Sequence, residues 1–225
     1  MSKALIVEDE SSIASELSGL LTSNGWIAEV ATSGADCLQM LDQFSYDLLL
    51  LDWNLPDITG LEICKKFRAG GGVIPIIFIT GQSGIDYKES GFDAGSDDYI
   101  TKPFDGRELM ARIRNVMRRP QTIVKADAVS VGTLSLNTLR RTLSEGEKAV
   151  QLTQVECNLL DFLARHSGQA FTTAQLFASV WHSDSESSEE TVRVHIRVLR
   201  RKLELAGLPP ILAHRRGFGY SIATP

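Results

Sequence analysis

The sequence predicts an α/β domain built on a five-stranded parallel sheet, followed by a smaller α+β domain of three helices and a β-hairpin. Three observations support this prediction. The chain of 225 residues is longer than one typical hydrophobic core. Its first half alternates short apolar runs with amphipathic segments. Its net charge changes from −7 over residues 1–119 to +2 over residues 120–225, which indicates two different tasks.

Strands are expected in the first half wherever a short apolar run is bounded by turn residues. The expected strands cover residues 4–7, 27–30, 48–51, 76–79 and 99–100, and the expected helices cover 11–24, 34–43, 60–69, 85–94 and 105–118. Five such units imply a parallel sheet covered by helices on both faces. We expect the flavodoxin-like strand order 2-1-3-4-5.

The first domain is predicted at residues 1–119, a linker at 120–127 and the second domain at 128–225. Thr153 and Glu156 have the spacing of a capping box, and Thr173 is expected to cap the next helix. The expected elements are short antiparallel strands within 131–150 with a turn at 144–147, helices over 153–165, 174–181 and 189–206, and strands around 211–213 and 219–222. Three helices and a hairpin indicate a winged helix-turn-helix.

The composition argues against membrane-bound and secreted proteins. The longest apolar runs are far shorter than the roughly 20 residues that span a bilayer, and the N-terminus leads directly into a strand. The isolated cysteines Cys37, Cys64 and Cys157 fit no zinc or redox spacing. We therefore expect a cytoplasmic protein with reduced core thiols and no membrane partner.

Chemically distinctive side chains follow four of the predicted strands. Glu8 and Asp9 follow the first strand, Asp52 the third, Thr80 the fourth and Lys102 the fifth. In the expected order these strands are neighbours, so the side chains converge where open α/β sheets bind ligands. Clustered carboxylates repel unless a cation is present, and Mg²⁺ prefers oxygen ligands. The pattern predicts phosphoryl transfer to Asp52, with Lys102 and Mg²⁺ neutralising the phosphoryl charge.

Each of these residues has an ordinary alternative role. Asp52 could cap a helix or bind a metal, and Lys102 could be a solvated surface residue. Glu8 and Asp9 could favour the N-terminus of the following helix. The occurrence of all of them at four strand ends, in the required order, favours the functional interpretation.

Residues 3–118 resemble the receiver domain of bacterial response regulators. Two departures stand out: relatives often have Ala, Ser or Thr in place of Gly81, and two Asp residues in place of Glu8 and Asp9. The segments that carry the resemblance are residues 5–10, 52–57, 80–81 and 97–104.

The resemblance implies that Asp52 accepts a phosphoryl group from a histidine kinase. Thr80 and Tyr99 would form a switch pair, in which Thr80 moves toward the phosphoryl group and Tyr99 turns inward behind it. The alternative for Tyr99 is an ordinary half-buried strand residue. The bond between Lys102 and Pro103 is expected to be cis. The implied Mg²⁺ ligands are Asp9, Asp52 and the main-chain carbonyl of Asn54, with Glu8 acting through water.

The helix expected at 189–206 is amphipathic and basic. Apolar residues recur from Val192 at core spacing, and basic residues lie opposite with few acids nearby. Such a helix fits a DNA major groove, and the adjacent hairpin can reach a neighbouring groove or the backbone. The alternative is a solvated basic face. The candidate DNA-binding residues are Arg193, Val194, His195, Arg197, Val198, Arg200, Arg201, Arg215 and Arg216.

We expect Val194 and Val198 to contact thymine methyl groups, which leaves hydrogen-bonding readout to arginines at 197, 200 or 201. Residues 128–225 resemble the winged-helix output domain of OmpR/PhoB-type response regulators. The carrying segments are residues 152–156, 191–203 and 216–220. Relatives have the charges of Glu190 and Arg193 exchanged, and often Arg at Val198. Relatives contact RNA polymerase through the segment that matches residues 182–188.

The resemblance also implies a phosphorylation-dependent homodimer. Relatives dimerise through the fourth helix, fifth strand and fifth helix, which would place two basic helices on direct-repeat DNA half-sites. A solvated charged surface is the alternative, because exposed ion pairs are individually weak. The matching charge pairs are Lys88 with Glu108, Asp98 with Arg112 and Asp97 with Arg114.

The sequence therefore predicts a phosphorylation-dependent, DNA-binding transcriptional regulator of a two-component system, and not a turnover enzyme. A phosphatase of the haloacid-dehalogenase type needs a second Asp where this chain has Asn54. A winged-helix regulator that works without phosphorylation is the second candidate. Such proteins usually lose pocket residues, and this pocket is complete.

Overall fold

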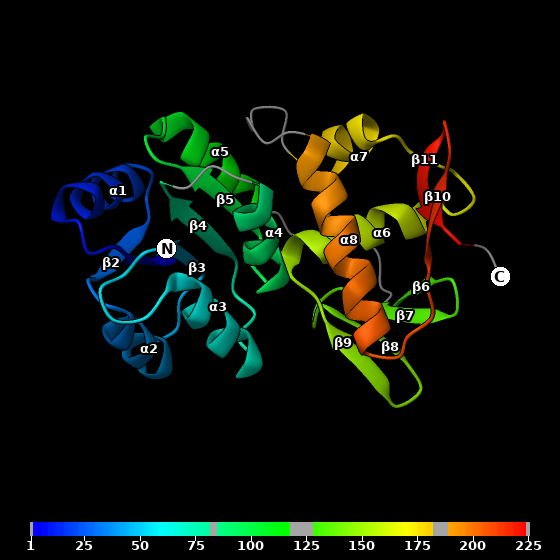
Figure 1. Ribbon diagram of the computed structural model, residues 1–225, viewed down its shortest axis with the longest axis horizontal. Helices are drawn as coiled ribbons and strands as arrows, with labels where there is room; N and C mark the ends of the chain where they lie inside the picture. The colour runs from blue at the N-terminus through cyan, green and yellow to red at the C-terminus, as the bar shows by residue number, and fades with distance from the viewer. Residues whose placement is uncertain (1, 82–84, 118–127, 182–188, 224–225) are drawn as a thin grey trace. The chain divides into compact units, whose positions relative to one another are not determined.

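The computed structural model describes residues 2–81, 85–117, 128–181 and 189–223 (Figure 1). The chain forms two compact units, Met1–Ile113 and Arg114–Pro225. The predicted linker at 120–127 lies outside the described residues. The domain bounds expected from the sequence, 1–119 and 128–225, stay predictions.

The first half of the chain is a parallel sheet with helices on both faces. The strands are β1 (Lys3–Val7), β2 (Ile27–Ala31), β3 (Leu48–Asp52), β4 (Ile76–Thr80) and β5 (Asp98–Thr101), and the helices are α1 (Ser11–Ser23), α2 (Gly34–Gln43), α3 (Gly60–Ala69), α4 (Ile85–Asp93) and α5 (Gly106–Val116). The strand order β2-β1-β3-β4-β5 confirms the predicted order. Helices α1 and α5 cover one face, and α2 and α3 cover the other (Figure 1).

The central strands explain why the apolar runs predicted this sheet. Every residue of β3 and β4 is buried, as expected for strands covered on both faces. Side chains alternate between the two layers, so Leu49, Leu51 and Phe78 pack into one core with Trp53. This packing fixes the carboxyl ends of β3 and β4 at one edge of the sheet.

A close backbone contact sets the start of α3 behind β3. A Cβ atom at Gly60 would lie 2.1 Å from the main-chain oxygen of Asp52, so this approach requires glycine. Thr59 caps the helix and forms a capping box with Glu62. The helix therefore begins directly against the carboxyl end of β3.

The second half contains an antiparallel sheet, three helices and a hairpin. Its elements are β6 (Val129–Val131), β7 (Leu134–Asn137), β8 (Thr142–Glu145), β9 (Lys148–Gln151), α6 (Gln154–Arg165), α7 (Thr173–Val180), α8 (Glu189–Leu205), β10 (Leu212–Arg215) and β11 (Gly219–Ile222). Strands β6 to β9 pair antiparallel in sequence order, and β10 pairs with β11. This arrangement confirms the winged helix-turn-helix class.

The predicted capping box of Thr153 and Glu156 is confirmed at the start of α6. The prediction for α7 is wrong by one residue, because Thr172 and not Thr173 is the cap. The Thr172 hydroxyl accepts a hydrogen bond from the Gln175 amide, and the Gln175 side chain accepts one from the Thr172 amide. The three-residue spacing to Gln175 therefore decides where the helix begins.

The three cysteines are free and buried, in agreement with the prediction. Burial raises the pKa of the Cys37 and Cys157 thiols to about 12, which keeps both protonated. Within the described part of the chain, every helix is too short or too polar to cross a membrane.

Candidate functional site

Three of the predicted site residues, Glu8, Asp52 and Lys102, meet at the carboxyl edge of the parallel sheet. The Lys102 ammonium lies 2.7 Å from Glu8 Oε2 and 2.9 Å from Asp52 Oδ2. Glu8 follows β1, Asp52 ends β3 and Lys102 follows β5. Both carboxylates are buried, with 1% of Glu8 and 5% of Asp52 exposed. The predicted convergence of the strand ends is therefore confirmed.

The backbone around Lys102 holds the ammonium in place. The amide of Lys102 donates to the carbonyl oxygen of Thr80 at 2.7 Å. The bond from Lys102 to Pro103 is cis, as expected. The Asp52 carboxylate has a second contact, because its Oδ1 atom accepts a hydrogen bond from the Asn54 amide at 3.3 Å. One carboxylate oxygen thus faces the cation and the other faces the following loop.

Glu8, Asp9 and Asp52 form a cluster whose nearest ligand atoms all lie within 4.8 Å of one another. Burial raises the pKa of Glu8, and the nearby charge of Asp52 adds to this effect against the hydrogen bond from Lys102. Burial lowers the pKa of Lys102, but its bonds to Glu8 and Asp52 outweigh burial and raise it. Three carboxylates facing one ammonium leave an excess of negative charge. An all-oxygen donor set with this charge fits Mg²⁺.

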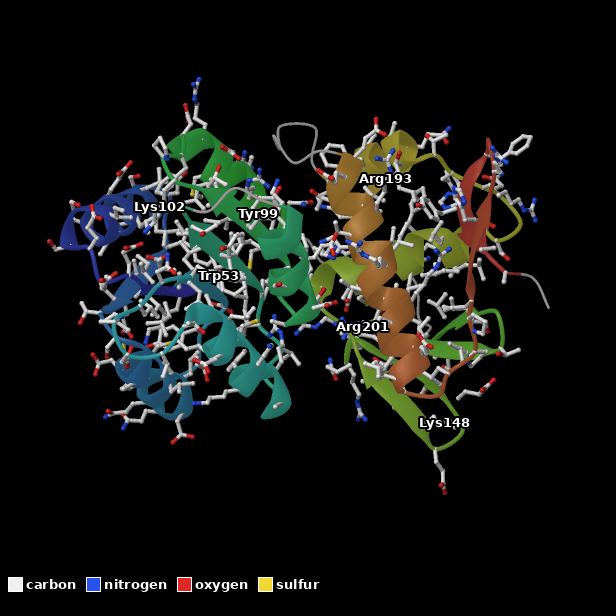
Figure 2. The ribbon with its side chains drawn as sticks, in the orientation of Figure 1. Trp53, Tyr99, Lys102, Lys148, Arg193 and Arg201 are labelled. Atoms are coloured by element: carbon white, nitrogen blue, oxygen red, sulfur yellow. The ribbon has the colours of Figure 1, made fainter. Side chains whose placement is uncertain are left out.

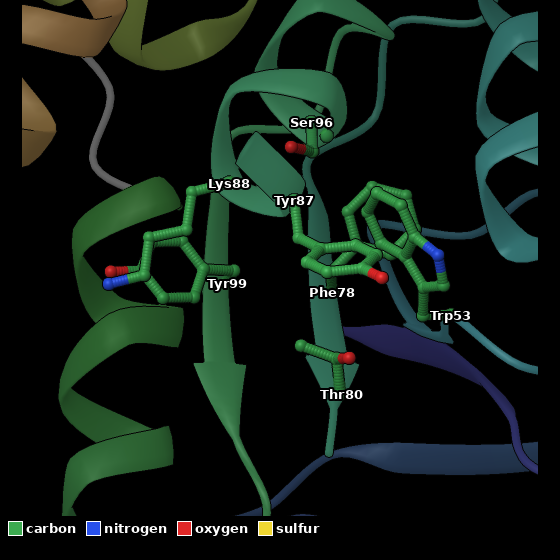
Figure 3. Close-up of a pocket in the computed structure, with 8 residues that line it drawn as sticks. Trp53, Phe78, Thr80, Tyr87, Lys88, Ser96 and Tyr99 are labelled. Atoms are coloured by element: carbon green, nitrogen blue, oxygen red, sulfur yellow. The ribbon is translucent and has the colours of Figure 1, made fainter. Parts of the chain in front are cut away.

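Thr80 and Tyr99 line the same pocket (Figure 3). The Tyr99 ring points toward Lys88 and away from Thr80. The Lys88 ammonium lies 4.4 Å from the centre of the ring, and the Arg112 guanidinium lies 5.7 Å from it. The Tyr99 ring therefore contacts two cations in this position. The residues lining the pocket are Trp53, Phe78, Thr80, Tyr87, Lys88, Gly91, Ser96 and Tyr99.

The charged residues expected to pair between protomers form contacts within one chain. Arg112 lies 3.0 Å from Asp98 and 2.6 Å from Glu108. The side chain of Asp97 pairs with Arg68 at 3.0 Å and accepts a hydrogen bond from the Ile76 amide. Burial raises the pKa of Asp98 against the opposing charge of Arg112.

A solvated surface is the wrong description for Asp97, Asp98 and Arg112, because each is at most 4% exposed. Glu108 and Lys88 are half-buried, and Arg114 is exposed. Within the chain, Asp97 pairs with Arg68. The sequence did not indicate a role for Arg68. It lies in a helix end rich in lysine and arginine, and nothing in that pattern points to Asp97, 29 residues away. The pairs across a dimer stay predictions.

Helix α8 presents its arginines to solvent. Lys202 binds Glu156 at 2.7 Å and fastens α8 to α6. Figure 2 shows Arg193 and Arg201 on this helix. The exposed arginines are Arg193, Arg197, Arg200 and Arg201.

The prediction that Val194 and Val198 lie on the face opposite the Val192 stripe is wrong, and His195, a candidate DNA-binding residue, is also inaccessible. All three are buried, with at most 4% of each residue exposed. The His195 ring packs against Trp181, 5.7 Å away between ring centres. The buried face of α8 is thus wider than the spacing of the apolar residues from Val192 indicated. The contact of Val194 and Val198 with thymine is not proposed further.

The hairpin of β10 and β11 contributes two more exposed arginines, Arg215 and Arg216. Arg200 connects α8 to this hairpin, because its guanidinium donates to the Leu212 carbonyl at 3.0 Å and lies 5.8 Å from the centre of the Tyr220 ring. Sequence patterning indicated the charge of Arg200 but not this contact. The segment 182–188, expected to touch RNA polymerase, lies outside the described residues.

Comparison with known proteins decides the family. The profile of the response regulator receiver domain matches residues 4–114, and that of the transcriptional regulatory protein C-terminal domain matches residues 146–222. The chain is 37% identical over 220 residues to the transcriptional regulatory protein DltR of Streptococcus agalactiae, with 98% of each covered. The crystal structure of DrrB, a Thermotoga maritima OmpR/PhoB homolog, matches along both whole chains with 28% identity and a TM-score of 0.54. This chain belongs to the OmpR/PhoB-type response regulators.

Other relatives agree with this assignment. The regulator is 37% identical over 226 residues to the sensory transduction protein RegX3 of Mycobacterium tuberculosis, with 99% of each covered. It is 38% identical to RcaC of Microchaete diplosiphon, but spans only about a third (34%) of that protein. A solved structure of a RitR mutant matches along both whole chains with a TM-score of 0.81 and 28% identity.

As an OmpR/PhoB-type response regulator, the chain is a transcription factor of a two-component system and not an enzyme. Its receiver domain implies a histidine kinase as partner, and its C-terminal domain implies DNA binding. The Glu8, Asp9 and Asp52 cluster is typical of a Mg²⁺-binding phosphoacceptor site.

Proposed function

We propose that Asp52 accepts a phosphoryl group from the phosphohistidine of a sensor kinase, and that this modification switches the regulator to a DNA-binding dimer. The observation that carries the proposal is the position of the Lys102 ammonium, 2.9 Å from Asp52 beside the Glu8 and Asp9 carboxylates. A carboxylate acting as a nucleophile toward phosphorus needs positive charge at this point, because negative charge gathers on the phosphoryl oxygens.

In the proposed reaction, an Asp52 carboxylate oxygen attacks phosphorus as the bond from phosphorus to the imidazole nitrogen breaks. The electron pair of that bond returns to the imidazole. Lys102 balances charge on the phosphoryl group, and the Thr80 hydroxyl donates a hydrogen bond to one of its oxygens. Mg²⁺ would be held by Asp9, Asp52 and the Asn54 carbonyl, with Glu8 acting through water. When bound, the ion supplies further positive charge to the phosphoryl oxygens.

The proposed output follows from Tyr99. As Thr80 moves toward the phosphoryl group, Tyr99 turns inward and leaves Lys88 and Arg112. The surface of α4, β5 and α5 then pairs with a second copy, using Lys88 with Glu108 and Asp98 with Arg112 across the interface. Two α8 helices would bind direct-repeat half-sites, with arginines contacting phosphates and bases.

Phosphorylation is tested with acetyl phosphate and Mg²⁺ on a phosphate-affinity gel. Wild type should shift, Asp52→Asn should not, and Asp42→Asn should shift like wild type because Asp42 is a residue of α2 outside the carboxylate cluster. Omission of Mg²⁺ should abolish the shift. Equal labelling of wild type and Asp52→Asn would overturn the assignment of Asp52.

The switch is tested by measuring dimerisation and DNA affinity with and without phosphodonor. The duplex is the sequence that wild type selects from a randomised library. Phosphodonor should raise affinity and dimer content in wild type and leave Asp52→Asn unchanged. An equal affinity in all four samples would instead support the winged-helix regulator that works without phosphorylation.

A further inference from the structure

The tip of the β10–β11 hairpin carries a large apolar side chain in water. The chain reverses over residues 215–218, where the Phe218 amide donates to the Arg215 carbonyl at 2.9 Å. Gly217 has a φ of 82°, which glycine adopts without strain at this point of a turn. Phe218 is 70% exposed. A single exposed apolar residue is common. Whether Phe218 has a function therefore depends on the residues that surround it.

Strand β11 is anchored directly after Phe218. Tyr220 and Phe171 exchange two main-chain hydrogen bonds of 2.8 Å each. A Cβ atom at Gly219 would lie 2.0 Å from the Phe171 oxygen, so the two backbones touch. Arg200 of α8 donates to the Leu212 carbonyl on the same hairpin. The position of Phe218 relative to the arginines of α8 is therefore fixed before any partner binds.

The charge around Phe218 selects the kind of partner. Arg215 and Arg216 are exposed at the same tip, and the sequence has no acidic residue after Glu204. An apolar ring flanked by two arginines is unsuited to a basic or purely apolar surface. It matches the minor groove of DNA, where arginines follow the negative potential and apolar side chains insert between base steps.

We infer that Phe218 is an apolar wedge that enters the minor groove next to the half-site bound by α8 and partly unstacks one base step. This inference rests on the proposed DNA binding. It adds a contact whose strength depends on how easily the DNA base step is deformed. Unstacking at this step bends the duplex toward the major groove. Pyrimidine–purine steps unstack most readily, so the wedge favours TA or CA/TG at that position.

The test compares Phe218→Ala, Phe218→Leu and Arg216→Ala with wild type on the duplex that wild type selects from a randomised library. Leu139→Ala is the matched control, because Leu139 is 79% exposed in the same unit and lies between β7 and β8. The duplex carries 2-aminopurine at each step flanking the half-site in turn, and its fluorescence reports unstacking. Energy transfer between dyes at the duplex ends reports the bend.

Wild type and Phe218→Leu should raise 2-aminopurine fluorescence at one step and bend the duplex. Phe218→Ala should lose both the fluorescence increase and the bend, and its affinity for the duplex should fall about tenfold. The salt dependence of its binding should not change, because no phosphate contact is lost. Arg216→Ala should instead lower the salt slope by about one unit. Leu139→Ala should match wild type.

Two results separate the inference from the function on which it rests. If wild type selects no duplex, the proposed DNA binding fails. If wild type binds but shows no unstacking, or if Phe218→Ala retains the fluorescence and the bend, the wedge is overturned while DNA binding stands. A loss of affinity in Phe218→Ala without a change in either signal also overturns the wedge.

Discussion

The Lys88 ammonium lies 4.4 Å from the centre of the Tyr99 ring, so a residue of the expected dimer surface also holds the expected switch residue. The contact is a cation–π interaction at the surface, worth roughly 0.5–1 kcal/mol. In the proposed dimer, Lys88 would exchange its contact with Tyr99 for the carboxylate of a partner's Glu108. Under the proposed function, dimerisation and release of Tyr99 would be coupled through one ammonium group.

Replacement of this ammonium should free Tyr99 before phosphorylation. We expect Lys88→Met to raise the population of inward Tyr99 by roughly two- to fivefold. The measurement is ¹⁹F NMR of protein that contains 3-fluorotyrosine, with the Tyr99 resonance assigned from Tyr99→Phe. Lys65→Met, an exposed position of α3, is the control. An unchanged Tyr99 resonance in Lys88→Met would contradict this role.

The contact of Gly60 with Asp52 predicts that alanine has opposite effects on stability at Gly60 and at Gly19. Gly60→Ala should destabilise the receiver by about 1–3 kcal/mol, because its Cβ atom would meet the Asp52 carbonyl and not a flexible side chain. Gly19→Ala in α1 meets nothing within 4 Å and should stabilise by about 0.4–1 kcal/mol. Urea unfolding of both variants measures the difference. Equal stability of the two variants would show that the strand end yields to the methyl group.

Asp57 predicts a dependence of stability on pH. Its carboxylate accepts the amides of Gly34 and Ala35 at the start of α2, each at 2.8 Å. These backbone bonds lower the pKa of Asp57 below its ordinary value. A depressed folded-state pKa contributes stability above the unfolded-state value of about 3.9, and this contribution is lost as the pH falls through the folded value.

Asp57→Asn should therefore be less stable than wild type at pH 7, and the difference should shrink below about pH 4. Urea midpoints of both proteins between pH 3 and pH 7 measure the difference. A gap that stays constant over this range would show that the charge of Asp57 does not contribute.

The sequence predicted the parts of the structure that depend on local patterns. The carboxyl ends of the apolar runs placed Glu8, Asp52 and Lys102 correctly, because parallel strands with helical crossovers have few possible topologies. The partners of buried charges could not be predicted. Arg68 meets Asp97 across 29 residues, and neither residue has a pattern that indicates the other.

Helix α8 shows the same limit in another form. Val194 and Val198 lie opposite the Val192 stripe on a helical projection, yet both are buried. Periodicity gives the centre of a buried face but not its width, which depends on how many neighbouring elements pack on the helix. The expected contact of these two valines with thymine methyl groups therefore fails, while the expected readout by the exposed arginines stays a prediction.

Substitutions of Arg200 and Arg197 should distinguish an arginine of α8 that also holds the hairpin from one that only binds DNA. Arg200 donates to the Leu212 carbonyl and faces the Tyr220 ring, so Arg200→Ala should loosen the hairpin as well as weaken DNA binding. Hydrogen exchange of the amides in β10 and β11 should accelerate about three- to tenfold, as expected for one lost hydrogen bond of roughly 0.5–1.5 kcal/mol. Arg197→Ala should leave this exchange unchanged and lower the salt slope of DNA binding by about one unit. If Arg200→Ala leaves hairpin exchange at the wild-type rate, Arg200 acts through DNA alone and the hairpin is positioned by Phe171 and Tyr220.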